Sequence, residues 1–406
     1  MSALLDSLLA GHEGPAAQAI TSAGLPGPRS EAWKYTSLRA LERRTFMAAQ
    51  PVAVDAALLA SIPAPRIVFV NGHFDASLSM LGALPRGLRI DTSETGSAPT
   101  ATLETRSGDE VFAALNVLLA RGGARIHAEG DIQTPLHLVQ VGRSGDADIA
   151  SHLRHAITLE AGASLTLLEH HVADGTHAHL ANDHLDVVLG EGAKLRHLRV
   201  QDDALAASRV LRSDATLATR ARYVRLDFEL GAALSRHELN VRLDGEGATV
   251  EAGGVLLADG RRHLDTRLQI THAAKDTRSA LPWRGLADGR GRVAFHGGIR
   301  IDAGADGSQA DLQNRNLLLA EGAEIDTQPV LVIHADEVQA AHGATVGQLD
   351  ATALFYLRSR GIGEFQARRI LTAAFCRDLL SVIDDAAVRT LVEARLDGAL
   401  ARMQDA

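Results

Sequence analysis

Residues Leu312–Asp350 read LQNRNLLLAEGAEIDTQPVLVIHADEVQAAHGATVGQLD and join two different sequence patterns. They contain an Asn-rich segment, an apolar strand over Pro329–Ile333, an acidic turn and a His-Gly pair at His342. A helical period begins at Asp350, a residue type that commonly caps the first turn of a helix. This stretch therefore marks the junction between a β-rich body and a helical tail.

Upstream of this junction, from Gly122 onward, short apolar strands alternate with Gly-Ala or Asp-Gly turns. Leu239–Leu243 alternates apolar and polar residues strictly, as a strand with one buried face requires. The predicted strands are Leu136–Val141, Ala156–Leu159, Leu165–Leu168, Leu185–Leu189, Leu239–Leu243, Leu264–Ile270 and Ile299–Asp302.

The turns between these strands resemble one another. The sequence EAGA at Glu160–Ala163 recurs as GEGA at Gly190–Ala193 and Gly245–Ala248, and as AEGA at Ala320–Ala323. Recurring turns without a helical period between them are typical of stacked coils. Aromatic residues make up only 3% of the chain, which suits ladders of aliphatic side chains. We therefore predict a mainly β fold with a β-solenoid core, and a sandwich or barrel is the alternative.

Helical patterns flank the strands on both sides. We expect a helix over residues 1–23, a helix-like stretch capped by Ser30, and a strand Arg66–Val70 that meets a tight turn at Asn71-Gly72. Residues 91–107 are expected to form a loop. Further helices are predicted over Asp109–Leu119, from Asp350 to Gly361, and over Glu364–Leu380 and Ala386–Met403. The predicted domains are 1–120 (helical, with a small strand element), 121–345 (β-helix core) and 346–406 (helical).

Composition limits the partners and the compartment. The net charge of −9 and the absence of a polybasic run do not favour binding to nucleic acid or to an anionic membrane. No apolar run approaches the about 18 residues of a membrane span. The N-terminus carries Asp6 and no basic segment, so it does not resemble a signal peptide. With Cys376 as the single cysteine, we expect a cytoplasmic protein without an internal disulfide.

Few short motifs in the sequence indicate a chemical activity on their own. A GxxxxGK[ST] loop, GxSxG, HExxH and CxxC are all absent, so we expect no ATP hydrolysis by this chain. Asp288–Gly291 reads as a hairpin turn. Cys376, beside Phe375, reads as a packing residue, and His342 alone reads as a turn histidine.

Five histidines lie close together in the sequence: His170, His171, His177, His179 and His184. The His-x-His spacing places His177 and His179 on one side of a strand. Imidazole is a common ligand of transition metals. Because neither a cysteine nor an ordered set of carboxylates accompanies them, a solvated solenoid face with polar ladders is favoured over a metal site.

Several segments resemble the SufD family of the Suf iron–sulfur cluster assembly system. They are Leu312–Ala320, Ala323–Pro329, Ala335–Val338, His342–Asp350 and Phe355–Ile362, with Ser30–Thr36, Leu281–Gly285 and Phe295–Ile301 upstream. The resemblance implies a right-handed parallel β-helix between helical domains. It also implies a non-catalytic scaffold that pairs with its paralogue SufB and supports cluster assembly and iron acquisition.

The resemblance further assigns roles to residues. The ATPase SufC would dock on the C-terminal helical domain, at Phe355, Tyr356, Leu357, Arg358, Arg360, Gly361 and Ile362. His342 would lie at the SufB interface as a ligand of the nascent cluster. Many relatives carry a cysteine shortly before that histidine, but Gln339, Ala340 and Ala341 stand here. The sulfur ligands would therefore come from SufB, and this chain alone would hold no cofactor stably. A reduced flavin in the complex, and a homodimer in the absence of SufB, are also expected.

Three other functions stay open at this point. A SufB-like, cluster-holding scaffold would need thiolates, and the solenoid has no cysteine. A polysaccharide-active enzyme on a β-helix would need secretion, which the N-terminus does not indicate. A purely structural interaction protein would use His342 only for packing.

Overall fold

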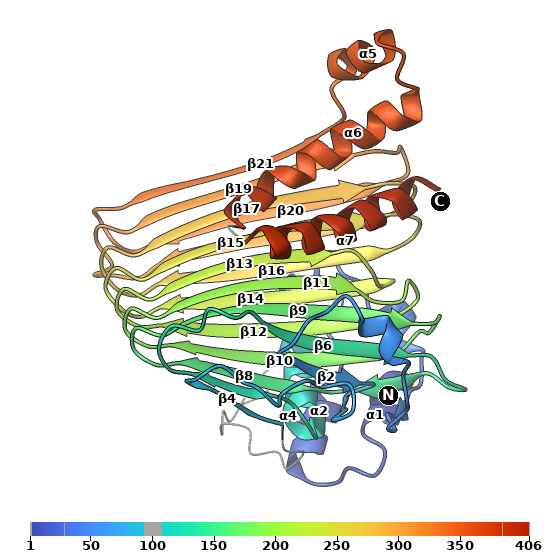
Figure 1. Cartoon of the computed structure of the whole chain (residues 1–406), viewed down its shortest axis with the longest axis vertical. Coiled ribbons are helices and arrows are strands. Elements are labelled where there is room, and N and C mark those ends of the chain that lie inside the picture. The colour runs from blue at the N-terminus through green and yellow to red at the C-terminus, as the bar shows by residue number, and fades with distance from the viewer. Residues whose placement is uncertain (1, 28, 93–107, 384, 406) are drawn as a thin grey trace.

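The computed structural model describes residues 2–27, 29–92, 108–383 and 385–405. Figure 1 shows helices at one end, a tall stack of strands in the middle, and three further helices beside and beyond the other end of the stack. Within the described ranges, no helix combines the length and apolar character needed to cross a membrane.

Two long sheets form the stack, and successive strands of the stack alternate between them. Sheet A has the order β20 (Glu324–Ile333), β18 (Arg292–Ile301), β16 (His263–His272), β14 (Leu234–Leu243), β12 (Ser208–Leu217), β10 (Leu180–Leu189), β8 (Arg154–Leu159), β5 (Arg125–Ala128) and β4 (Leu88–Asp91), with β7 (Ile149–Ser151) between β10 and β1 (Met47–Ala48). Sheet B has the order β21 (Gln339–Gly347), β19 (Gln309–Leu318), β17 (Arg278–Ala287), β15 (Thr249–Ala258), β13 (Arg222–Glu229), β11 (Lys194–Asp202), β9 (Ser164–Asp174), β6 (Leu136–Arg143), β2 (Arg66–Val70) and β3 (His73–Phe74).

Neighbouring strands in each sheet come from successive coils of a solenoid. Leu165 on β9 lies beside Leu195 on β11, which lies beside Tyr223 on β13 and then Val250 on β15. Among the described strands, only the β2–β3 and β4–β5 pairs are antiparallel. The predicted β-solenoid is therefore confirmed, and the sandwich or barrel alternative is wrong.

Three of the four similar turns, at Glu160–Ala163, Gly190–Ala193 and Gly245–Ala248, form one corner of the solenoid, whereas Ala320–Ala323 lies at the opposite corner. Gly162 and Gly192 have φ angles of 70° and 66°, a left-handed conformation that glycine adopts without strain. The amide of Gly162 donates to the carbonyl of Glu191 in the next coil, over 2.7 Å. The alanine after the glycine at this corner, Ala163, Ala193 or Ala248, is fully buried. The repeat thus stacks the corners as well as the strands.

The space between the two sheets, the lumen, is filled mainly by Leu, Val, Ile and Ala side chains. The seven predicted strands fall on observed strands that are longer, and only Ile299–Asp302 passes the end of its strand, by one residue beyond β18. Leu165–Leu168, for example, is only part of β9, because Glu169 and His171 continue the strand with inward-facing polar side chains. Polar residues at such positions read as turns in the sequence, although the strand continues through them.

The N-terminal part differs from the prediction in its details. The expected helix over residues 1–23 is two helices, α1 (Ala3–Leu8) and α2 (Pro15–Ala23), because Gly11 and Gly14 adopt positive φ angles between them. Ser30 makes no capping hydrogen bond, and its hydroxyl donates to Asp109 instead. The remaining helical turns of this part are η1 (Glu31–Trp33), α3 (Arg39–Glu42), η2 (Ala56–Leu59), η3 (Gly108–Glu110) and α4 (Val111–Leu119).

Two other local predictions have different outcomes. The turn at Asn71-Gly72 is confirmed, with φ angles of 48° and 81° between β2 and β3. Asp288–Gly291 is a corner between β17 in sheet B and β18 in sheet A, so the hairpin prediction is wrong. Most of the predicted loop 91–107 lies outside the described residues, and Asp91 itself belongs to β4. The domain boundaries stay a prediction.

The C-terminal helices follow the sequence closely. They are α5 (Ala351–Ser359), α6 (Glu364–Arg377), η4 (Asp378–Val382) and α7 (Ala386–Asp405). Asp350 caps α5 by accepting from the amides of Thr352 and Ala353, as expected. Buried residues of α6 and α7 pack with the outward-facing apolar side chains of sheet B, such as Leu257 and Leu286. Figure 1 shows α6 and α7 along that sheet.

Candidate functional site

The last coil of the solenoid has no strand beyond it in the described part of the chain. β20 and β21 are the terminal strands of sheets A and B. The core residues Ile325, Leu331 and Ala340 of this coil are only partly buried. A terminal strand with unpaired backbone groups and an uncovered core is a surface on which another chain can pair. We call this surface, formed by β20 and β21, the open end.

His342 lies in the lumen-facing column of the open end. It stands on β21 directly beside Leu312 of β19, which is fully buried. Parallel pairing keeps one column of side chains on the same face of the sheet. The imidazole therefore continues the core column, but it is exposed because no coil covers it.

A small amide cluster lies one coil below, also facing the lumen. Asn314 Oδ1 accepts from Asn316 Nδ2 over 2.6 Å and from the Thr327 hydroxyl over 2.7 Å. Asn314 Nδ2 and Asn316 Oδ1 are buried without a partner. The Asn-rich segment seen in the sequence thus provides polar groups inside the lumen beneath the open end.

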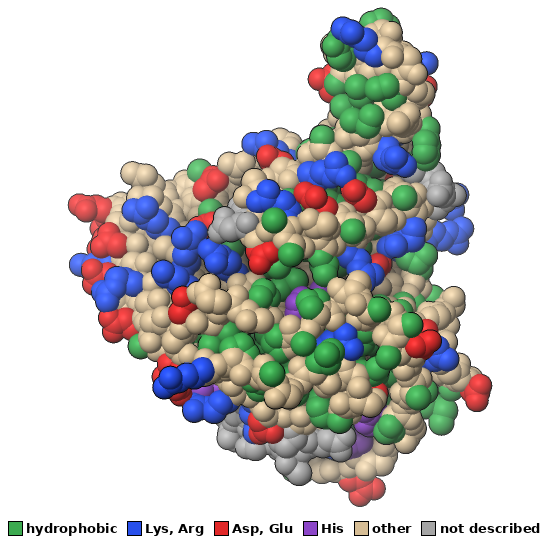
Figure 2. Space-filling model, viewed as in Figure 1, with side chains coloured by type: hydrophobic (Ala, Val, Ile, Leu, Met, Phe, Trp, Pro, Cys, Tyr) green, Lys and Arg blue, Asp and Glu red, His purple; other side chains and the backbone are tan. Residues whose placement is uncertain are grey.

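The predicted SufC-docking residues come together on one projecting helix. Figure 1 shows α5 standing clear of the solenoid, and none of its residues is buried. Phe355 and Tyr356 are 73% and 57% exposed. Arg360 lies over the Tyr356 ring, and Arg358 forms an ion pair with Glu364 over 3.3 Å. Figure 2 shows hydrophobic side chains gathered on this projecting part of the molecule. Exposed aromatic side chains on such a helix make it a candidate interaction surface.

The five clustered histidines are buried and lie at separate places, so the prediction of a solvated face is wrong. His171 faces the lumen and hydrogen-bonds Glu169 over 2.7 Å. His170 stacks on His137 on the outer side of the same sheet. The rings of His177 and His179 stack 4.1 Å apart, in the segment before β10 and not on a strand. The sequence places these residues close together, but alternate strand faces and a corner separate them.

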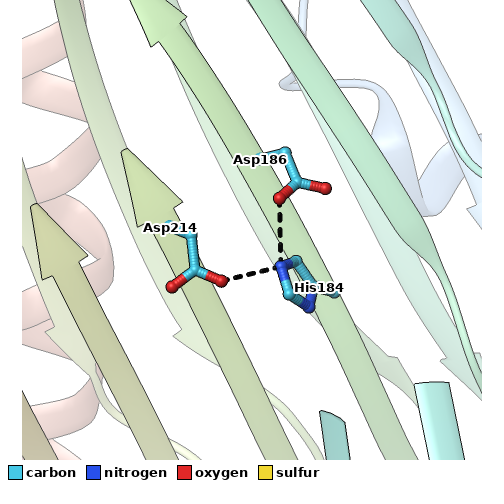
Figure 3. Close-up of side chains that lie close together, drawn as sticks. All are labelled: His184, Asp186 and Asp214. Carbon is cyan, nitrogen blue, oxygen red and sulfur yellow. Dashed lines mark hydrogen bonds and ion pairs between the residues drawn. The ribbon is translucent and has the colours of Figure 1, made fainter. Parts of the chain in front are cut away.

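His184 is the member of this group with metal-ligand geometry. Figure 3 shows His184 and Asp186 on β10 with Asp214 from β12. His184 Nε2 lies 3.2 Å from Asp186 Oδ1 and 3.0 Å from Asp214 Oδ2, and the three ligand atoms fall within 4.8 Å of one another.

The surroundings of this triad favour an ion-pair ladder. Arg154 donates to Asp186 over 2.8 Å, and Arg212 donates to Asp214 over 2.8 Å. Both carboxylates therefore already have a cation. Burial of His184 disfavours its charged form, but the hydrogen bonds to Asp186 and Asp214 outweigh burial and raise the pKa of this ring. A charged imidazole between two carboxylates ties adjacent coils together.

The middle coils contain a buried ionic network that sequence reasoning missed. Arg199 is fully buried and binds Asp227 over 2.7 Å and also Glu229. Arg225 binds the other side of Asp227 over 2.8 Å. The register of the repeat could have revealed it, because Arg199 and Asp227 occupy one column in successive coils.

Comparison with known proteins now assigns the family. Residues 141–375 match the family model described as SUF system FeS cluster assembly, SufBD core domain. The chain is 30% identical over 399 residues to an iron-sulfur cluster assembly SufBD family protein of Synechocystis, covering 93% of this chain and 88% of the relative. This chain belongs to the SufBD family. It is also 29% identical to the iron-sulfur cluster assembly protein SufD of Escherichia coli, over 93% of this chain and 90% of that protein. Over 64% of this chain and 60% of the relative, it is 28% identical to SufD of Bacillus subtilis.

The SufBD match includes both candidate surfaces. It begins within β6 and ends within α6, so it contains the open end, His342 and α5. The chain is therefore an iron–sulfur cluster assembly protein of this family.

The single cysteine of the chain is not placed to act as a cluster ligand. Cys376 is completely buried in α6, and burial raises the pKa of its thiol to about 12. The packing interpretation of Cys376 is thus confirmed, and the open end has no thiol of its own.

Proposed function

We propose that this SufBD protein is a non-catalytic scaffold subunit that pairs with SufB through the open end. The observation that carries the proposal is the uncovered last coil, where Ile333 and Val346 are 43% and 44% exposed. A second solenoid of the same family could continue both sheets and bury this apolar surface. With SufB absent, a second copy of this chain would cover the same surface.

His342 would then lie inside the SufB interface as a neutral nitrogen ligand of the nascent cluster. Imidazole is an established ligand of iron centres. Because Gln339, Ala340 and Ala341 precede it, the thiolates must come from SufB. Iron acquisition through this subunit is part of the same proposal and rests on this imidazole.

SufC would dock on α5 and the start of α6. The exposed Phe355 and Tyr356 support this, together with Phe365, which is 52% exposed. This position places an ATPase at the end of the solenoid that also carries His342. A reduced flavin in the complex and a cytoplasmic location stay predictions, and no residue is assigned to the flavin.

The role of His342 is tested in the co-purified complex. We expect His342→Ala to lower iron retention and cluster yield without loss of SufB. His334→Ala is a matched control, because His334 is an exposed imidazole in the corner of the same coil. Unchanged iron retention in His342→Ala would remove this residue from the mechanism and favour the purely structural role.

The SufC surface is tested with the double variant Phe355→Ala and Tyr356→Ala. We expect loss of SufC from the purified complex while SufB is retained. Deleting all residues after Leu349 is a poorer test, since it would uncover Leu257 and Leu286 on sheet B. Val188→Ala, at a residue that is 50% exposed on β10, is the control for loss of an exposed apolar side chain. Full SufC retention in the double variant would refute the docking site.

Two alternatives lose support. The SufB-like reading needs cluster thiolates, and Cys376 is buried. Membership of the SufBD family leaves no observation in favour of a polysaccharide-active enzyme.

A further inference from the structure

A cavity lies at the end of the molecule opposite the open end, where the N-terminal helices meet the first coils. Its volume is about 410 Å³, within the range of small-molecule sites. The lining comes from α1, β1, the β2–β3 turn, the end of α4 and β7. Leu8, Phe46, Met47 and Leu119 give it apolar walls.

The titratable side chains that line this cavity are all basic. They are His12, His73, Arg121 and His152, and no aspartate or glutamate lies among the described lining residues. Arg121 donates to the carbonyl of Leu118 over 3.3 Å and to His12 Nε2 over 3.2 Å. Within the described ranges, no carboxylate forms an ion pair with this guanidinium. Arg121 is exposed at the rim of the cavity, so its guanidinium is solvated and open to an anion that enters beside the apolar walls.

The neighbouring histidines add hydrogen-bonding groups to the site, and no negative charge. His12 Nδ1 donates to the carbonyl of Ala10 over 3.3 Å, which leaves Nε2 to accept from Arg121. His152 Nδ1 accepts from Asn182 over 3.2 Å, so the proton of this ring is on Nε2. Burial, with the nearby His12 and Arg121, lowers the pKa of His152 to about 4. His152 is therefore a neutral donor, and the fixed positive charge is that of Arg121.

We propose that this cavity binds a small organic anion, a carboxylate or a phosphate ester that carries an apolar group. The Arg121 guanidinium pairs with the anion, since its planar array of donors matches both carboxylate and phosphate oxygens. Leu8, Phe46 and Leu119 contact the apolar part. The site is separate from the open end and from α5, so it does not depend on the partners proposed above.

The test titrates the full-length chain with phenyl phosphate and with benzoate by calorimetry, and uses benzamide as the neutral analogue. We expect a dissociation constant of about a few millimolar for at least one anion, as suits ligands of this size. Benzamide should bind at least about tenfold more weakly. The tighter of the two anions tells whether the natural ligand class is phosphate or carboxylate.

Three variants locate the site. Arg121→Gln should weaken anion binding by about tenfold or more, while Arg39→Gln removes the same charge from an exposed position on α3 and should change nothing. Ala10→Trp, at an exposed lining residue, should block the cavity without affecting the core. Circular dichroism checks that each variant folds. Equal effects of Arg121→Gln and Arg39→Gln, undiminished binding to Ala10→Trp, or no binding of either anion to the native chain, would overturn the proposal.

Discussion

Replacing Arg199 by methionine tests whether the lumen network stabilises the solenoid through charge pairing. Arg199 is completely buried, and it is the only arginine bound to Glu229 in the described structure. After the substitution, Asp227 keeps Arg225. Glu229 has no arginine left and keeps the Ser235 hydroxyl at 2.7 Å and the more distant His237 Nδ1 at 4.0 Å. An uncompensated buried carboxylate costs about 3–5 kcal/mol. We expect Arg199→Met to lower the free energy of unfolding by about that amount.

The measurement is urea unfolding, followed by circular dichroism and by the fluorescence of the buried Trp283. Arg222→Met is the matched control, because Arg222 pairs with Glu251 over 2.7 Å with side chains 52% and 41% exposed. Such an exposed pair contributes at most about 1 kcal/mol. Adding Glu229→Gln to Arg199→Met should restore part of the loss, since the orphaned charge is removed. The reasoning fails if Arg199→Met costs no more than Arg222→Met, or if Glu229→Gln deepens the loss.

Three further outcomes follow from single contacts. A Cβ at Gly254 would overlap the Trp283 ring and the carbonyl of Asp227, so Gly254→Ala should cost about 1–3 kcal/mol and shift the Trp283 emission; an unchanged urea midpoint would contradict it. His184 has a raised pKa in the folded chain, so its ion pairs stabilise fully below about pH 6.5 and are lost as pH rises through the folded pKa. Urea midpoints across this range should therefore fall more in the native chain than in His184→Gln. Cys376, with a pKa of about 12, should react with a thiol reagent only after unfolding in urea, and rapid labelling of the native chain would refute its burial.

The fold was predictable from sequence because its signals are local and repeated. Three of the four similar turns occupy the same corner, and Ala320–Ala323 lies at the opposite one. Strict alternation in Leu239–Leu243 matches its burial along β14. The buried charges were not predictable in the same way. From the sequence pattern alone, Arg199 and Glu169 would be predicted to be exposed, since charged side chains are almost never fully buried unless paired. Both partners of Arg199, and the partner His197 of Glu169, stand one coil away, so only the three-dimensional register brings these pairs together.

The candidate site was likewise only partly predictable from the sequence. Helix α5 could be located because the Asp350 cap and Gly361 act within a few residues. The sequence could not show that all residues of α5 are unburied, because their burial depends on how far the helix projects from sheet B. Likewise, the sequence shows that His342 precedes a glycine, but only the register beside Leu312 shows that it faces the lumen.

The position of His342 limits what this chain can contribute to a cluster. The lumen-facing column below the imidazole contains Leu312 and then Leu281, both fully buried and apolar. Deeper still, Arg225 sits beneath Ala252 in the middle of the ionic network. Two leucines and Ala252 thus separate the imidazole from the nearest buried charge of its own column, and no thiol lies at the open end. If His342 acts as proposed, it supplies a single nitrogen ligand above this leucine column, and the partner chain would have to bring both the sulfur ligands and the charges that balance the iron.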